Sequence, residues 1–188
     1  MNGSRVKRNL AAATLVTAAA LLAFVDSAMA QAPAGSVAAK IPEKPLVVGH
    51  RGAAGLLPEN TLAAFKRGCE LGIDAIELDV LLSADGELVV HHDFKLKPEI
   101  ARTADGAWVP SGSQPAIKDL TLAKLKSYDI GRLQPKTSYV ARFPDQTPSG
   151  GERIPTFKEV IALFKKSCGS ATRLFVERLP ATTLASSG

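Results

Sequence analysis

The residues best suited to chemistry begin with an acidic pair in the segment Ile-Glu-Leu-Asp-Val at residues 76–80. Apolar and acidic residues alternate there with a period of two, which predicts a β-strand with Glu77 and Asp79 on the same face. Two carboxylates on one face repel each other, and a hard divalent cation bound between them relieves that repulsion. A solvent-exposed amphipathic strand explains the same alternation, so the segment alone leaves both interpretations open.

Reactive side chains also follow three other predicted strands. Short apolar runs predict these strands at residues 46–49, 87–91 and 173–177. Each run ends at or near a side chain that can bind a metal or transfer a proton, namely His50, His92 and Glu177. Because the C-terminal ends of parallel strands meet at one rim of an α/β barrel, we expect these side chains to converge with Glu77 and Asp79.

Two histidines, three carboxylates and an arginine together favour hydrolysis of a phosphate ester. One histidine can take a proton from the nucleophile while the other gives a proton to the leaving group. Three carboxylates can hold one Mg²⁺ or Ca²⁺ and leave positions for water and substrate oxygens. The guanidinium of Arg51 offers a planar pair of donors to a phosphate. A glycosidase needs two carboxylates around a sugar and no cation, and a zinc site more often shows His and Cys at short spacing.

A strand–helix–strand unit is expected to position the first of these residues. The apolar run at residues 46–49 is typical of a strand buried on both faces. A helix over residues 62–71 follows, with Asn60 as its N-cap and Gly72 near its end. The second strand, at residues 75–81, comes directly afterwards, and such short connections imply parallel strands with a right-handed crossover.

The second part of the chain is less regular. Stretches rich in proline and glycine with little periodicity predict long loops at residues 94–117 and 128–151, on either side of a short helix at residues 118–127. An amphipathic helix over residues 157–167 then precedes the fourth strand. The predicted order, β-α-β-β-loop-α-β, belongs to the α/β class.

The N-terminus has the pattern of a secretory signal peptide. Residues 1–30 combine a basic start, an apolar run at residues 10–25 and the small-residue site Ala-Met-Ala at residues 28–30. The apolar run is short for a bilayer span, so we expect cleavage after Ala30, a periplasmic or secreted protein and no stable membrane anchor. Residues 31–45 are rich in alanine and proline and are expected to form a flexible linker.

The composition is that of an ordinary globular protein, with 46% hydrophobic and 22% charged residues. The net charge of +5 is not gathered in a basic run, and one Trp with two Tyr offers little base stacking, which argues against nucleic-acid binding. An oxidising compartment would permit a disulfide between Cys69 and Cys168, but they lie on different predicted helices. We therefore expect Cys69 to be a buried apolar residue. The sequence indicates no oligomeric state.

Five motifs, taken with their order and spacing, resemble the glycerophosphodiester phosphodiesterases. They are Val-Gly-His-Arg-Gly at 48–52, Pro-Glu-Asn-Thr at 58–61, Ile-Glu-Leu-Asp-Val at 76–80, Asp-Gly at 85–86 and His-Asp at 92–93. Three further stretches look like the exported bacterial branch of that family, at residues 129–132, 143–146 and 153–156. The resemblance extends over residues 45–177.

The resemblance implies a TIM-type (β/α) barrel and metal-dependent hydrolysis of a small-molecule glycerophosphodiester to sn-glycerol 3-phosphate and an alcohol. The implied site consists of His50 and His92 as the acid/base pair, Glu77, Asp79 and Glu177 as ligands of one Ca²⁺ or Mg²⁺, Arg51 as a phosphate contact and Glu59 as a support of the loop after the first strand. The third histidine, His91, is expected to point away from the rim, and Lys97 is expected to be solvated. A phospholipase or sphingomyelinase D-like phosphodiesterase and a non-catalytic fragment are the alternatives.

Only the N-terminal half of a barrel is expected, over residues 46–177. A complete barrel of eight strands takes about 250 residues, whereas four strands are predicted in this sequence. The chain also departs from the family pattern near Arg178, because the lysine expected after Glu177 is missing and Pro180 interrupts the strand. We therefore expect residues 178–188 to be an aberrant tail, and unpaired strand edges with impaired activity.

Overall fold

The computed structural model of the chain describes residues 44–178. The predicted signal peptide, the predicted linker up to residue 43 and the predicted tail from residue 179 onward lie outside these described residues. None of the helices in this part of the chain combines the length and the apolar character that crossing a bilayer requires.

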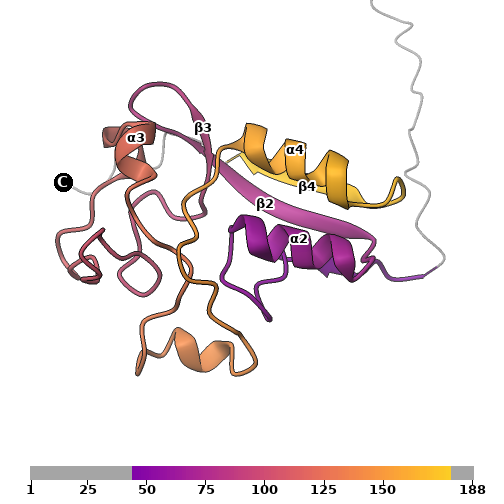
Figure 1. Ribbon diagram of the computed structural model, residues 1–188, viewed down its shortest axis with the longest axis horizontal. Helices are drawn as coiled ribbons and strands as arrows, with labels where there is room; N and C mark the ends of the chain where they lie inside the picture. Colours follow the sequence, from indigo (N-terminus) through magenta and orange to yellow (C-terminus); the bar gives the residue numbers. More distant parts are fainter. Residues whose placement is uncertain (1–43, 179–188) are drawn as a thin grey trace, which may run out of the picture. The chain divides into compact units, whose positions relative to one another are not determined.

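A four-stranded sheet is built around its longest strand, β2 (Ala75–Leu82). Both β1 (Val48–Gly49) and β4 (Arg173–Arg178) pair with β2 in parallel, and β3 (Leu88–Val90) pairs with it antiparallel. Figure 1 shows β2 running through the middle of this arrangement. The parallel pairs confirm the predicted strand–helix–strand unit, since each crossover passes through a helix or a longer excursion.

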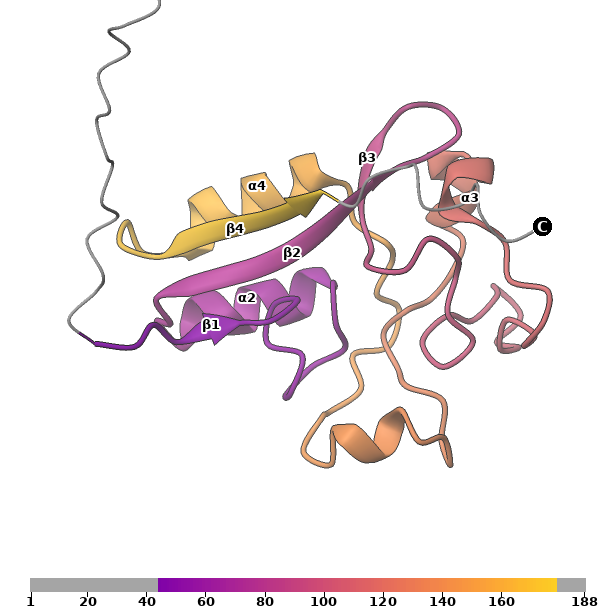
Figure 2. The same cartoon turned by 180° about the vertical axis from the view of Figure 1, so that it is seen from behind.

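Two helices cover one face of the sheet. Figures 1 and 2 show α2 (Leu62–Glu70) and α4 (Phe157–Ser167) on the same side of β2. The apolar residues of β2 point toward these helices and form a buried cluster with residues such as Phe65 and Val160. The alternation predicted for residues 76–80 is therefore confirmed on its apolar side, and the acidic residues of β2 point to the opposite face.

Both helices begin at threonine caps. Thr61 caps α2 by accepting a hydrogen bond from the amide of Ala64, so the prediction that Asn60 caps this helix is wrong. Asn60 lies one residue earlier with a positive φ of 54°. The cap of α4 is a reciprocal capping box between Thr156 and Glu159, which explains why this helix begins where the sequence pattern places it.

The excursion between β3 and α4 contains only short helical pieces, and two of them lie where one helix is predicted at residues 118–127. These are the 3₁₀ turn η1 (Ile117–Asp119), α3 (Leu122–Leu125) and the 3₁₀ turn η2 (Val140–Arg142). The excursion nevertheless has a buried apolar cluster of its own, which includes Leu125 and Ile130 and joins the end of β2 to the loops. It is therefore a packed part of the fold.

Two predictions about the strands need correction. The first strand is not buried on both faces, because 41% of Val48 and 59% of Val47 are exposed. The third strand is antiparallel to β2, so it begins beside Leu82 and its last residue, Val90, lies opposite Val80, at the level where the parallel strand β4 ends. His92 thus approaches the acidic residues through a hairpin.

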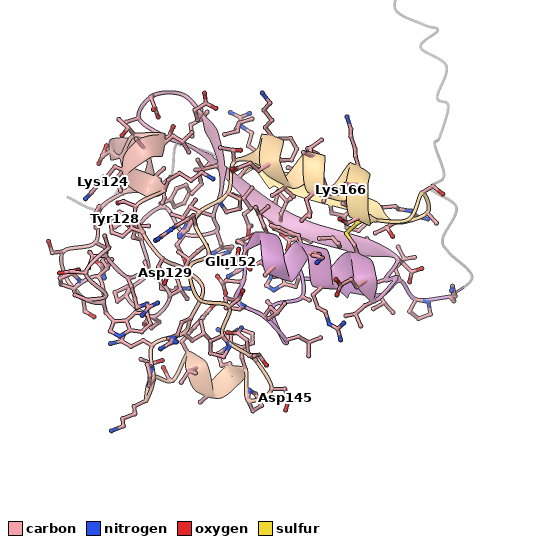
Figure 3. The ribbon with its side chains drawn as sticks, in the orientation of Figure 1. Lys124, Tyr128, Asp129, Asp145, Glu152 and Lys166 are labelled. Carbon is pink, nitrogen blue, oxygen red and sulfur yellow. A yellow bond between two sulfur atoms is a disulfide. The ribbon has the colours of Figure 1, made fainter. Side chains whose placement is uncertain are left out.

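Cys69 is buried as predicted, and its pairing, which the sequence left open, is decided by the structure. Cys69 and Cys168 form a disulfide with a Cα–Cα distance of 4.5 Å, across 99 residues of sequence. Figure 3 shows it as a yellow bond where α2 and α4 lie close together. Because both helices pack on the same sheet face, the end of α2 and the residue that follows α4 become neighbours, which separate helical patterns do not indicate.

Candidate active site

Three carboxylates predicted to bind a cation lie together on β2 and β4. Glu77, Asp79 and Glu177 each offer an oxygen, and these atoms lie within 4.8 Å of one another. Asp79 and Glu177 are direct partners in the parallel ladder, and Glu77 lies two residues before Asp79 on the same face. Asp79 is buried, Glu77 is half-buried and Glu177 is exposed, so the group opens to solvent on one side.

The surroundings of Glu77 disfavour the ionised form of its carboxyl group. Burial raises the pKa of Glu77 above its usual value, and the negative charge of Asp79 raises it further. The amide of Arg51 and the charges of His50 and Arg51 lower this pKa without reversing the shift. An all-oxygen donor set with unbalanced negative charge fits a hard divalent cation such as Ca²⁺ or Mg²⁺.

The turn after β1 holds His50 and Arg51 against β2. The amide of Arg51 donates a hydrogen bond to Oε2 of Glu77 at 2.8 Å, and the amide of Gly52 donates to the Glu77 carbonyl at 3.2 Å. Gly52 has a φ of +90°, and a Cβ there would lie 2.9 Å from atoms of Ala64. Glycine is therefore required for the turn to pass between β2 and α2.

The guanidinium of Arg51 lies between two acids. Its Nη1 donates to Oε1 of Glu59 at 2.9 Å, and its Nε lies 3.7 Å from Oδ2 of Asp79. Burial tends to lower the pKa of Arg51, but the charge and hydrogen bond of Glu59 raise it overall, so the group stays charged. Within the described residues, the buried Nε has no hydrogen-bond partner. A phosphate oxygen is a suitable acceptor for such a donor.

The end of β3 brings His92 to the same region. The amide of His91 donates to the carbonyl of Asp79 at 3.1 Å, which places the His91–His92 segment directly beside the acidic strand. Nδ1 of His92 lies 3.2 Å from Oδ1 of Asp93, and the other Asp93 oxygen pairs with Lys97 at 2.9 Å. Burial tends to raise the pKa of Asp93, but Lys97 outweighs it and the pKa lies below its usual value. Asp93 can therefore orient the ring of His92 as a carboxylate.

His91 is buried with a separate set of contacts. Its Nδ1 lies 2.8 Å from the Asp93 carbonyl, and burial lowers the pKa of the ring. The structure thus gives the two adjacent histidines different surroundings, and only His92 has its ring against a carboxylate.

Three residues near these groups were missed or misread in the sequence. Asn60 donates to Oδ2 of Asp79 at 3.4 Å, although it looked like a helix cap. Lys97, expected to be solvated, pairs with Asp93, and the spacing of four residues was the available signal. Tyr139 reaches Glu59 from 80 residues away, and no local pattern marks it.

Comparisons with known proteins all lead to the same enzyme family. A model of the "Glycerophosphoryl diester phosphodiesterase family" matches residues 50–173. Among curated proteins, the chain is 43% identical over 120 residues to a glycerophosphodiester phosphodiesterase of Caldanaerobacter subterraneus and 32% identical over 164 residues to one of Bacillus subtilis. These matches cover 64% and 86% of this chain, and 40% and 50% of the two relatives. The chain thus spans half or less of the length of these relatives.

A solved structure supports the fold. The structure of a Silicibacter pomeroyi protein assigned to the glycerophosphoryl diester phosphodiesterases superposes with a TM-score of 0.67 at 35% identity. The superposition covers 73% of this chain and 47% of that one. The four strands and two covering helices of residues 44–178 therefore correspond to part of a TIM-type barrel, as the sequence predicts.

Proposed function

Because the chain belongs to the glycerophosphoryl diester phosphodiesterase family, we propose that its rim of acids and histidines serves hydrolysis of a glycerophosphodiester to sn-glycerol 3-phosphate and an alcohol. The observation that carries this proposal is the cluster of Glu77, Asp79 and Glu177, whose oxygens lie within 4.8 Å of one another beside the turn that bears Arg51. Acidic oxygens and an arginine at one place suit an anionic substrate bound through a cation.

The three carboxylates would hold one divalent cation, Ca²⁺ or Mg²⁺. Such a cation, when bound, polarises a phosphoryl oxygen and stabilises the negative charge that develops in the transition state. Asn60 would keep the Asp79 carboxylate in place through its hydrogen bond to Oδ2. Arg51 would contact the phosphate through its unpartnered Nε, while Glu59 restrains the far side of the guanidinium.

His50 and His92 are proposed as the acid/base pair. One imidazole removes a proton from the attacking water as the new P–O bond forms, and the other protonates the departing alkoxide as the old P–O bond breaks. Asp93 supports this role for His92 by fixing its Nδ1 side, which leaves Nε2 for the substrate.

Export is proposed together with this activity. The N-terminal pattern of residues 1–30 supports it, and so does the Cys69–Cys168 disulfide, because such bonds persist mainly in oxidising compartments. Fractionation of cells that express the tagged chain tests this: the processed protein should start at Gln31 and leave the cytoplasm. An unprocessed cytoplasmic chain would contradict the proposal.

The activity is tested by release of sn-glycerol 3-phosphate from glycerophosphocholine by the purified chain, with Ca²⁺ or Mg²⁺ and after chelation. Because the chain spans about half of the length of the Bacillus subtilis relative, we expect slower turnover than for that relative measured in parallel. Glu177→Gln should abolish the stimulation by metal.

Matched histidine variants sharpen this test. The chain has three histidines, so His92→Asn can be compared with His91→Asn, in which the amide retains a donor in place of Nδ1. We expect His92→Asn to lose about 10²- to 10⁴-fold in kcat and His91→Asn to retain activity. Equal losses in both variants would argue against the assignment of His92.

The two alternatives are separated by substrate and by binding. Preference for intact phospholipid over glycerophosphocholine would favour a phospholipase D-like activity. Calorimetric binding of glycerol 3-phosphate with Ca²⁺ but no turnover by the chain would indicate a non-catalytic fragment. Failure to bind either the cation or glycerol 3-phosphate would overturn the proposed function.

A further inference from the structure

Tyr139 reaches the candidate site from the excursion that precedes α4. Its hydroxyl donates a hydrogen bond to Oε2 of Glu59, across 80 residues of sequence. The other carboxylate oxygen of Glu59 accepts from Nη1 of Arg51 at 2.9 Å. Glu59 is only 4% exposed. One of its carboxylate oxygens is held by the guanidinium of Arg51 and the other by the phenol of Tyr139.

The ring of Tyr139 also lies against two cations. Nζ of Lys97 is 4.5 Å from the ring centroid, and the guanidinium of Arg142 is 5.4 Å from it. Lys97 pairs in turn with Asp93, whose second oxygen lies beside His92. A continuous series of contacts therefore runs from His92 through Asp93, Lys97, Tyr139 and Glu59 to Arg51, which joins both histidine-bearing turns.

A packing role does not account for the hydroxyl. The ring belongs to a small apolar cluster with Ile100 and Leu133, and it meets Phe143 edge to face with 5.4 Å between centroids. Phenylalanine would fill the same space. The hydroxyl adds a hydrogen bond to a buried carboxylate, which is costly to leave without a partner. Burial, reinforced by Glu59, raises the pKa of Tyr139, so the phenol keeps the proton that it donates.

We infer that Tyr139 is a positioning residue for phosphate recognition. Its hydroxyl fixes Glu59, Glu59 fixes the guanidinium of Arg51, and the buried Nε of Arg51 is thereby held ready for an oxygen of the substrate phosphate. The phosphate part of this inference rests on the proposed function, whereas the coupling from Tyr139 to Arg51 does not.

The coupling is tested without substrate. Tyr139→Phe removes one oxygen, and Tyr128→Phe is a matched control, because Tyr128 is the other tyrosine of the chain and is also buried. Figure 3 shows Tyr128 beside Lys124 and Asp129, in the excursion between β3 and α4. In ¹⁵N–¹H spectra, with the Arg51 Nε signal assigned through Arg51→Lys, Tyr139→Phe should shift or broaden that signal and Tyr128→Phe should leave it in place. An unchanged Arg51 signal in Tyr139→Phe would overturn the inference.

The phosphate part is tested by calorimetry with sn-glycerol 3-phosphate at saturating Ca²⁺. Tyr139→Phe should weaken binding about five- to tenfold, as expected for loss of one ordinary intramolecular hydrogen bond, and Ca²⁺ affinity should not change. In a Glu59→Gln background, Tyr139→Phe should weaken binding no further. If it weakens binding equally with and without Glu59, or if Tyr128→Phe weakens it as much, Tyr139 does not act through Glu59 and the inference fails.

The two tests also separate this inference from the proposed function. A shifted Arg51 signal together with no binding of glycerol 3-phosphate by the unmodified chain would retain the coupling, but it would overturn both the phosphate role and the proposed function. Binding by the unmodified chain with an unchanged Arg51 signal would support the proposed function and overturn only the role of Tyr139.

Discussion

At the scale of single residues, two partly buried acids have pKa values that are shifted in opposite directions. Burial tends to raise the pKa of Asp129, but the amides of Gly131 and Gly151 and the charge of Arg102 outweigh it, so this pKa lies below its usual value. Burial also raises the pKa of Glu77, and there the neighbouring Asp79 adds to the shift. Asp129 is satisfied within the protein and stabilises a loop, whereas Glu77 is left with excess negative charge.

This difference leads to a prediction for Glu77→Gln. Because the pKa of Glu77 is higher in the folded than in the unfolded chain, its ionised form destabilises the metal-free fold above that raised pKa, and the destabilisation fades as the pH falls through it. The side-chain oxygen of Gln can still accept the hydrogen bond from the backbone amide of Arg51. The metal-free variant should therefore melt at a higher temperature than the unmodified chain at pH 7.

Bound Ca²⁺ should reverse the order of the two melting temperatures, so that the unmodified chain melts higher than Glu77→Gln. At a Ca²⁺ concentration 100 times its dissociation constant, binding should stabilise the unmodified chain by about 2.7 kcal/mol, and Glu77→Gln should show little of this gain. The Ca²⁺ affinity of the unmodified chain should fall as the pH decreases through the raised pKa, because binding requires the carboxylate. Thermal melts with Ca²⁺ and with chelator at several pH values measure both effects. A metal-free variant that melts at a lower temperature would contradict this account of Glu77.

At the scale of elements, α2 and α4 are joined covalently as well as by packing. The Cys69–Cys168 disulfide closes a loop of 99 residues that contains β2, β3 and the whole excursion. Cross-linking positions so far apart restricts the unfolded chain. The disulfide also lies close to the carboxylate cluster in sequence, because Cys168 precedes β4, the strand that carries Glu177.

Removal of this disulfide should be costly. The double substitution Cys69→Ser with Cys168→Ser should lower the free energy of unfolding by about 2–4 kcal/mol, as is typical for native disulfides. Urea titration with and without a reducing agent provides the measurement. The reducing agent should destabilise the unmodified chain and should not affect the double variant. Equal stability of the two proteins would show that packing alone holds α2 and α4 together.

At the scale of the whole molecule, the described residues leave apolar side chains exposed on two strands. Val47 and Val48 lie at and before β1, and Phe175 and Val176 lie on β4, each at least 40% exposed. Within residues 44–178, β1 and β4 each pair only with β2. Such surfaces favour association with other apolar molecules.

We predict that the purified chain binds the dye ANS and self-associates as its concentration rises. Val48→Thr combined with Val176→Thr should lower dye fluorescence with little change in melting temperature, because threonine keeps the branched shape that strands favour. Val89→Thr is the contrasting control: Val89 is fully buried, so this change should lower the melting temperature and not the fluorescence. Absence of ANS binding by the unmodified chain would show that these side chains are covered.

The sequence by itself determined the local features of this protein. Alternation places Glu77 and Asp79 on one face of β2, the capping residues and apolar stripe define α4, and the order of the motifs identifies the family. Each of these follows from backbone periodicity or residue spacing, which neighbouring residues encode.

Only the tertiary structure decided how distant parts of the chain meet. The Cys69–Cys168 disulfide and the hydrogen bond between Tyr139 and Glu59 both join elements whose own sequence patterns do not indicate their partners. The partially exposed β1 is a further case, because an apolar run shows what a strand can bury and not what packs against it. Contacts across 80 or 99 residues depend on the path of the chain between them, and local propensities do not specify that path.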